Sequence, residues 1–340
     1  MDLDILMKHS ESVPIVTEEN LIEYDVNKED INNMLYGVRE KHFFRADSQL
    51  FSGLIRDLQD DPNCAYVTHV NELIQRNGYV PKHISALYKY TDIDIGLREV
   101  IASRIMNYFE IPTSYEMLVK VDDRNYGVLS ADYVPSGKEM YTLGDFRIYT
   151  DRSVELDHNT ILDRMDIVYK SKRRDNPLPH VNSSQEFKNQ VHSILEDYMY
   201  GYLVRTIILG DSDFHQDNCA ILFDEDKISI DQLIHFDYDG SLRTNKMNYG
   251  LTHTDLKFVA TMYPHIFKKF VSKMNSLLQK YEGDKTRLES ILDDDSIPKL
   301  CDENKEIEEL IIDRLVKARS ICNDIIRDIF ISTDNFEKLA

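Results

Sequence analysis

Two short stretches of the chain concentrate side chains that could hold a metal ion and act on a hydroxyl. The first, "LGDSDFHQDNCAILF" (209–223), places Asp213 and Asn218 five residues apart, between a long apolar run and a short strand pattern. The second, "IHFDYDGSL" (234–242), carries Asp237 at the end of a strand pattern that runs back. If the two strands pair as a hairpin, Asn218 and Asp237 lie together. A carboxylate and an amide side by side suit Mg²⁺, which prefers oxygen ligands and leaves positions open for phosphate.

The third polar residue of this set, Asp213, has a different expected role. A carboxylate in the loop before the metal ligands could accept the proton of a hydroxyl or orient a nucleophile. An Asp, then an Asn five residues later, then a strand and a second Asp form the catalytic half of a kinase-like site.

A kinase-like site also requires a cation for the phosphates of the nucleotide. "ALYKYT" places Lys89 in a strand pattern, and "GLREVIASRIMNYFEIPTS" places Glu99 in the helical pattern that follows. A strand lysine paired with a helix glutamate is the arrangement that grips the α- and β-phosphates in protein kinases. Both halves of the expected site therefore occur in the chain, in the required order.

These motifs resemble those of HipA-like and CtkA-like serine/threonine kinases. "LGDSDFHQDN" is similar to their catalytic loop, G-N-x-D-x-H-x-x-N, and "HFDYDGSL" is similar to their F-D-x-G-S metal-binding loop. The resemblance implies that Asp213 is the catalytic aspartate and that His215 braces its loop. It also implies that Asn218 and Asp237 bind Mg²⁺, with Asp239 competing for the role of Asp237.

The resemblance extends over residues 83 to 245. "SADYVP" is similar to the strand leading into the hinge, so Tyr133 and Val134 are expected to flank the adenine of ATP. The implied activity is an ATP- and Mg²⁺-dependent transfer of the γ-phosphate to a hydroxyl. A protein Ser or Thr, the chain's own serines and a small molecule are all open as the acceptor.

The sequence departs from the family pattern in three respects: one missing loop and two substituted positions. No glycine-rich phosphate loop precedes Lys89, and "ADSQLFSG" (46–53) offers only a poor substitute. Asp217 stands where the family often has a lysine, and Asp211 stands where it prefers an asparagine. The first two departures favour a pseudokinase, a kinase-like protein that serves as a nucleotide-binding regulator. Transfer of AMP instead of phosphate is a third possibility within the same fold.

An alternative of another class uses some of the same residues. If the strand continued, His235, Asp237 and Asp239 would alternate along it and point to one face. Together with Asp213 and His215 they could form the two-metal site of a phosphohydrolase. This alternative leaves the strand lysine and the helix glutamate unexplained, so it ranks second among the enzyme hypotheses.

Composition limits the partners of the protein. The chain has 340 residues and a formal net charge of −20, which argues against a nucleic acid or an anionic membrane as the main partner. No signal-peptide pattern and no apolar run of roughly 20 residues are visible. The four cysteines are scattered and fit no zinc spacing. We expect a cytoplasmic protein, or one exported by a route that leaves no such mark.

The periodicity of apolar residues predicts a mixture of strands and helices, and the resemblance implies that they form a two-lobed, protein-kinase-like α+β fold. A small N-terminal lobe (1–134), with an unassigned extension, would carry a sheet and one packed helix. A helical C-terminal lobe (135–340) would carry the catalytic and metal-binding loops. The expected strands are 83–91, 115–121 and 126–134, and the expected helices of the second lobe are 187–209, 255–281 and 305–330.

Overall fold

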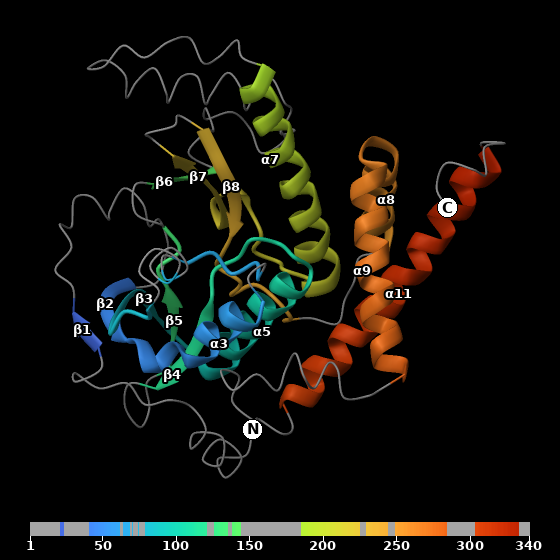
Figure 1. The fold of residues 1–340 in the computed structure, drawn as a ribbon. Helices are drawn as coiled ribbons and strands as arrows, with labels where there is room; N and C mark the ends of the chain where they lie inside the picture. Colours follow the sequence, from blue (N-terminus) through green and yellow to red (C-terminus); the bar gives the residue numbers. More distant parts are fainter. Residues whose placement is uncertain are drawn as a thin grey trace.

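The computed structural model describes most of both lobes. It covers residues 21–23, 41–61, 64–68, 70, 74, 79–120, 126–134, 138–143, 185–224, 229–243, 249–283 and 303–332. Within these ranges the protein combines two small antiparallel sheets with a helical part (Figure 1). The α+β class predicted from the sequence is confirmed, whereas the division of the chain near residue 134 stays a prediction.

A five-stranded antiparallel sheet forms the first lobe. Its strand order is β1-β2-β3-β5-β4, so β3, which carries Lys89, lies at its centre. The stretch 46–53 ends β2 and then forms a 3-10 turn and the start of α3. The elements of this lobe are β1 (Leu21–Glu23), β2 (Lys41–Asp47), α3 (Ser52–Asp60), β3 (His83–Thr91), β4 (Glu116–Lys120) and β5 (Tyr126–Ala131).

Helix α5 (Ile93–Tyr108) packs closely against this sheet. Gly96 permits the approach, because a Cβ atom at this position would lie 2.6 Å from Leu118 Cδ1 of β4 and 2.8 Å from Thr91 Cγ2. The helix ends before Glu110, whose φ of 59° is left-handed, and Pro112 lies just beyond. This packing presents Glu99 of α5 to Lys89 of β3.

The second lobe contains a three-stranded sheet of order β6-β7-β8 and a group of helices. The helix expected over 255–281 is in fact two helices, because Pro264 cannot continue the hydrogen bonding of the first and instead starts the second. The elements are β6 (Lys138–Thr142), α7 (Gln185–Leu203), a π-helical segment (Val204–Leu209), β7 (Cys219–Asp224), β8 (Ser229–His235), α8 (Tyr249–Met262), α9 (Pro264–Gly283) and α11 (Glu303–Ser332).

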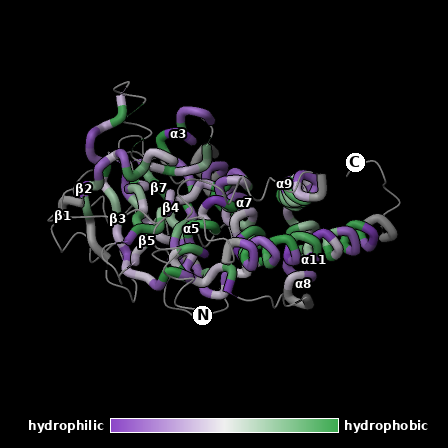
Figure 2. Tube along the Cα trace, turned by 90° about the horizontal axis from the view of Figure 1, so that it is seen from below, coloured by the Kyte–Doolittle hydropathy of each residue, from purple (hydrophilic) through white to green (hydrophobic). Residues whose placement is uncertain are grey.

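One large hydrophobic cluster joins the helices of both lobes. It takes side chains from α5, the π-helical segment, α8, α9 and α11, with Phe109, Ile208, Phe270 and Ile311 fully buried. Hydrophobic and hydrophilic turns alternate along α11 (Figure 2), the pattern of a helix that buries one side. The loop that follows α7 therefore stands on a packed helical base.

Backbone hydrogen bonds also join the two lobes directly. His235, at the end of β8, donates its N–H to Pro112 O (2.9 Å), and its carbonyl accepts from Ser114 N (3.1 Å). On the other side, Val67 N donates to Thr113 O at 2.8 Å. The end of β8 is thus fixed against the connection between α5 and β4, immediately before the turn that carries Asp237.

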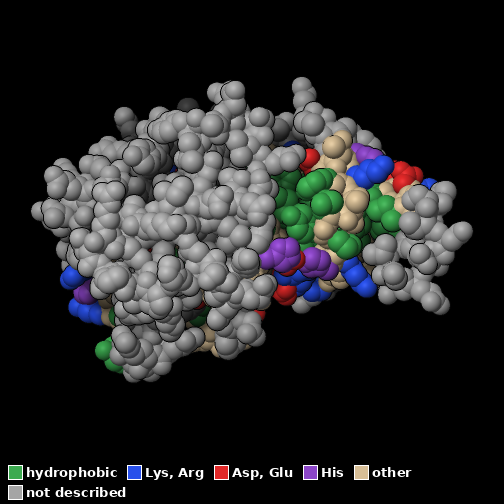
Figure 3. Space-filling view, turned by 90° about the horizontal axis from the view of Figure 1, so that it is seen from above, with side chains coloured by type: hydrophobic (Ala, Val, Ile, Leu, Met, Phe, Trp, Pro, Cys, Tyr) green, Lys and Arg blue, Asp and Glu red, His purple; other side chains and the backbone are tan. Residues whose placement is uncertain are grey.

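The upper face of the helical lobe carries a polar link between two helices. The Nε2 atoms of His192 in α7 and His265 in α9 lie 3.1 and 3.0 Å from the same Glu196 Oε1. Figure 3 shows histidine and acidic side chains together there, beside hydrophobic ones.

Among the described residues, no helix is both long and apolar enough to cross a bilayer.

The close approach of α5 to the sheet predicts the effect of Gly96→Ala. The added methyl group collides with Leu118 and Thr91, so we expect a loss of about 1–3 kcal/mol in the free energy of unfolding, as for other overpacked cores. Urea denaturation followed by circular dichroism measures it. Ser272→Ala, at an exposed position of α9, is the control and should change stability by about 0.5 kcal/mol or less. Equal stabilities of the two variants would contradict the packing described.

Candidate active site

Lys89 connects the two lobes at the centre of the site. Its Nζ is hydrogen-bonded to Glu99 Oε1 of α5 and lies 2.9 Å from Asp237 Oδ1 of the second lobe. The Lys89 side chain is 9 % exposed and that of Glu99 1 %, whereas Asp237 keeps 30 % of its side chain exposed. The structure therefore brings the predicted strand lysine, helix glutamate and metal-loop aspartate into direct contact.

A third carboxylate, Glu116 of β4, faces the same ammonium group. It is buried and accepts hydrogen bonds from the hydroxyls of Ser114 (2.5 Å) and Ser130. Burial alone would disfavour the charged form of Lys89. The carboxylates of Glu99, Asp237 and Glu116 outweigh this effect and raise the pKa of Lys89 well above its ordinary value. Lys89 thus contacts two acidic side chains and lies near a third, and burial raises the pKa of Glu99 to about 8.

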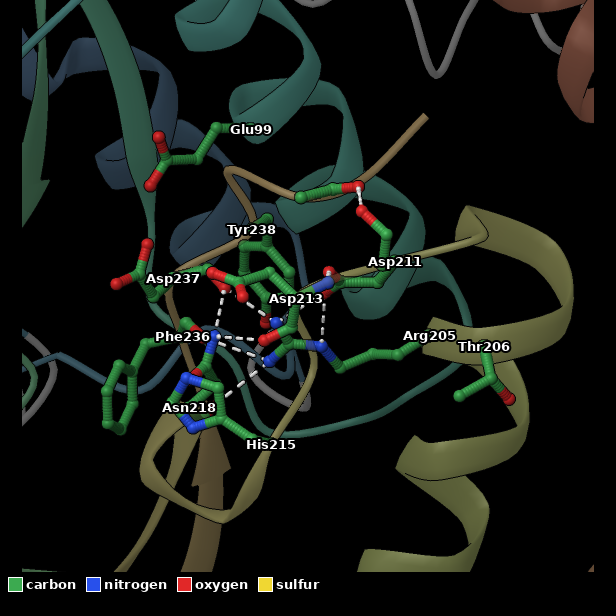
Figure 4. Close-up of polar contacts among 12 residues, drawn as sticks. Glu99, Arg205, Thr206, Asp211, Asp213, His215, Asn218, Phe236, Asp237 and Tyr238 are labelled. Carbon is green, nitrogen blue, oxygen red and sulfur yellow. Dashed lines mark hydrogen bonds and ion pairs between the residues drawn. The ribbon is translucent and has the colours of Figure 1, made fainter. Parts of the chain in front are cut away.

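Asn218 is oriented by a short 3-10 turn, Gln216–Asn218. His215 begins this turn, since its Nδ1 accepts from Asp217 N at 3.2 Å and its carbonyl accepts from Asn218 N at 3.0 Å. The Asn218 Nδ2 donates to the carbonyls of Asp213 (3.4 Å) and Asp237 (3.2 Å), as Figure 4 shows. This use of the nitrogen leaves Oδ1 as the atom of the amide that can hold a cation beside Asp237. The residues present therefore fit Mg²⁺.

Arg205, in the π-helical segment, holds these loops together from below. Its Nε and Nη2 donate to Asp211 Oδ2 at 2.9 and 2.6 Å. The guanidinium also donates to the carbonyls of Asn218 (3.0 Å), Phe236 (2.9 Å) and Asp237 (2.6 Å). It is completely buried. The two loops expected to be catalytic and metal-binding are therefore fixed to one cation.

The Arg205 contacts explain why an aspartate stands at position 211. Its side chain is fully buried against Arg205, and its second oxygen, Oδ1, accepts from Asp213 N at 3.1 Å. Burial disfavours the charge of Arg205, but Asp211 outweighs this and raises its pKa. A neutral asparagine would leave the buried guanidinium without a counter-charge. The carboxylate also orients the backbone of Asp213, whose side chain lies exposed beside Asn218 and Asp237 (Figure 4).

The turn that follows β8 departs from extended geometry. Asp237 has φ 57° and Leu242 has φ 56°, both left-handed and rare for residues other than glycine. Gly240 is required between them, because a Cβ atom there would lie 2.6 Å from Asp211 Oδ1 and 2.7 Å from Asp213 N. Arg98 of α5 donates to the carbonyl of Leu242. The turn is thus held at both of its strained ends.

The expected adenine-flanking residues lie at the junction of the lobes. Tyr133 is buried and stacks on Phe236, with ring centroids 5.4 Å apart and planes at 15°. Val134 is half-buried, and its N–H donates to Asp132 Oδ1 at 3.0 Å. The hinge stretch therefore packs on the residue that precedes Asp237.

The geometry disfavours the two-metal alternative. Strand β8 ends at His235, so the alternation of His235, Asp237 and Asp239 does not extend beyond it. The His235 ring is fully buried, and burial, with Arg205 nearby, lowers its pKa well below the ordinary value. Among the described residues, no group of three or more His, Cys, Asp and Glu side chains is arranged to hold a metal. Between the two aspartates, the Lys89 contact favours Asp237 over Asp239.

Sequence reasoning missed the buried charges that support the site. Arg205 stands inside the apolar run "LVRTIIL", and Glu116 and Arg104 stand in similarly apolar surroundings. A charged residue inside a buried pattern indicates a partner, because buried charges must be paired. All three residues carry this signal, but the sequence does not identify the residue that pairs with each of them. Asp217, the other departure from the family pattern, is exposed beside His215.

The pairing of Arg205 with Asp211 predicts the effect of Asp211→Asn. Removing one member of a buried ion pair costs about 3–5 kcal/mol, and we expect a loss of this size in thermal and urea unfolding. Asp231→Asn is the control, because Asp231 forms a half-exposed pair with Lys138 and should cost about 1 kcal/mol or less. The double variant Arg205→Met/Asp211→Asn should lose less than the sum of the single changes. Additive losses would show that the pair is not coupled.

Solved structures that resemble the chain include two of low identity. No family model matches the chain, and no curated protein matches it in sequence. The crystal structure of the Helicobacter pylori proinflammatory kinase CtkA is 15% identical, with 74% of this chain and 92% of that chain covered and a TM-score of 0.43. HipA of the Shewanella oneidensis MR-1 toxin–antitoxin system, solved with HipB and operator DNA, is 10% identical, with 75% and 64% covered and a TM-score of 0.38.

Proposed function

We propose that the protein is an ATP- and Mg²⁺-dependent phosphotransferase of the serine/threonine kinase type. The observation that carries the proposal is the arrangement of Lys89. It contacts Glu99 and Asp237 together, while Asn218 bonds the backbone of both Asp213 and Asp237. These five residues come from four separate parts of the chain, and their proximity supports the proposal.

Each residue has a distinct part in the proposed reaction. Lys89, oriented by Glu99, would contact the phosphates of ATP. Asn218 and Asp237 would hold Mg²⁺, which when bound neutralises phosphate charge. Asp213 would orient the acceptor hydroxyl and receive its proton. The hydroxyl oxygen forms a bond to the γ-phosphorus, the bond to the β–γ bridging oxygen breaks, and ADP leaves.

Positioning accounts for most of the proposed catalysis. The protein forms no covalent bond to the transferred group, so rate enhancement comes from holding nucleotide and acceptor in line and from charge stabilisation. The Arg205 contacts serve this purpose, because they fix the carbonyls of Asn218 and Asp237 beside the reacting groups. The partners proposed are a nucleotide and a hydroxyl-bearing acceptor, either a protein or a small molecule.

A nucleotide-binding regulator is the second candidate function. The observation that favours it is Asp217, an exposed acidic side chain in the catalytic loop. A negative charge at this position cannot neutralise a transferring phosphate. The nucleotide site itself does not depend on Asp217, so this candidate keeps ATP binding and lacks transfer.

The first test compares wild type with Asp213→Asn and Asp237→Asn, using γ-labelled ATP, Mg²⁺ and added protein substrates. Asp213→Asn should keep Mg²⁺-ATP binding, measured by calorimetry, and lose transfer by about 10²–10⁴-fold, the usual contribution of an acid–base group. Asp237→Asn should weaken the binding itself. Asp239→Asn is the matched control and should affect both measurements less than Asp237→Asn.

Each result separates the candidates. Binding by the wild type without transfer to any acceptor, itself included, would support the regulator. Full activity of Asp213→Asn would show that the catalytic loop has been assigned wrongly. Absence of Mg²⁺-ATP binding by the wild type would remove both candidates.

A further inference from the structure

The helix that leads into the catalytic loop ends in an unusual geometry. Val204–Leu209 forms a π-helical segment, directly before Gly210 and Asp211. A π turn spans one more residue than an α turn, so it rotates the residues that follow relative to a regular helix, and such turns are frequent at functional sites. Arg205 and Thr206 lie on this segment, beside the catalytic loop (Figure 4).

A second buried arginine reaches this segment from a distant helix. Arg314 of α11 is 1 % exposed, and its Nη1 donates to Ile207 O at 3.3 Å. The carbonyls of the last helical turn lack partners within the helix and carry partial negative charge. A guanidinium is well suited to this end, because it stays charged even though burial lowers the pKa of Arg314.

Arg314 also dictates the residue that ends the segment. Gly210 has φ 58°, and a Cβ atom there would lie 2.2 Å from Arg314 Nη2 and 2.3 Å from its Cζ. The guanidinium therefore occupies the space beside the last residue before the catalytic loop. On the other side of the same turn, Asp211 N donates to Arg205 O at 2.9 Å, and Leu242 N donates to Leu209 O at 2.7 Å.

We infer that Arg314 is a positioning residue that holds the π-helical segment in register, so that Arg205 reaches Asp211 and the two loops. The segment is held between two arginines, one within it and one from α11. When Arg314 is removed, the carbonyl of Ile207 loses its donor and the turn can rewind. Arg205 then rotates away from the carbonyls of Asn218 and Asp237. Helix α11 thereby controls the catalytic loop without contacting any reacting group.

The effect on phosphoryl transfer rests on the proposed function, whereas the effect on the loop does not. The experiment therefore measures amide hydrogen exchange by mass spectrometry in the full chain. Peptides covering 204–218 and 237–243 report the loop, and peptides covering β3 and β5 report the first lobe. Transfer from γ-labelled ATP is measured on the same samples.

Arg314→Met should speed exchange in the loop peptides by about tenfold or more, as expected for lost buried hydrogen bonds, and leave β3 and β5 unchanged. Arg314→Lys, which keeps a cation near Ile207, should restore part of the protection. The matched control, Arg327→Met, removes an arginine of the same helix whose side chain is 70% exposed and should match wild type. In transfer, Arg314→Met should lower kcat more than it changes KM for ATP.

Two results would overturn the inference. One is a folded Arg314→Met protein whose loop peptides exchange their amide hydrogens at the same rate as in the wild type. The other is equal acceleration throughout the chain, which would make Arg314 a general stability residue. If Arg314→Met does not fold, Arg314→Lys gives the same distinction. Loop exchange that changes as expected in a protein without transfer activity would sustain the inference and reject the proposed function.

A double-variant cycle adds an independent check. Gly210→Ala should speed loop exchange through the collision with the guanidinium and the cost of a left-handed alanine. In the Arg314→Met background the collision disappears and only the backbone cost remains. The two changes should therefore combine to less than the sum of their effects. Additivity would show that Arg314 does not act on the loop through Gly210.

Discussion

The site depends on the burial of one cation, Arg205. A guanidinium removed from water is stable only if nearly all of its donors are satisfied. In this protein the acceptors are the carboxylate of Asp211 and three backbone carbonyls, taken from the two loops that carry the candidate catalytic and metal-binding residues. The aromatic rings of Phe214 and Tyr238, each 4.5 Å from the guanidinium carbon, enclose it. Displacing either loop would leave a buried charge unsatisfied, which keeps both loops in place.

The second constraint is an imbalance of charge above the loops. Glu99 and Asp237 contact the ammonium group of Lys89, Glu116 acts on its charge from nearby, and only Asp237 is substantially exposed. An excess of acidic groups in a low-dielectric region is unfavourable by itself, and it becomes useful where a cation and a polyphosphate enter together. The left-handed backbone of Asp237 stores strain at the same place. The proposed binding region thus contains destabilising features, whereas the packed helices beneath it stabilise the fold.

The sequence predicts the parts of this arrangement that local patterns encode. The strand of Lys89, the helix of Glu99 and the two polar loops follow from periodicity and spacing, and the structure brings their side chains together. The sequence does not predict the partners of Arg205, Glu116 and Arg314, because these contacts join residues far apart in the chain. The π-helical segment also has no local signature, since the apolar run 203–209 suits a regular helix equally well. The break before Pro264 is visible in the sequence, because a proline disfavours helical geometry in the residue before it.

The backbone ladder through Tyr66, Thr113 and His235 has a mechanical consequence. These two parallel bridges connect the segment before β3, the connection after α5 and the end of β8 in one continuous path. A hinge-like opening of the lobes about residues 132–134 would have to break main-chain hydrogen bonds on this path. These hydrogen bonds therefore fix the end of β8 to the connection after α5, so the two segments would move together in any opening of the lobes.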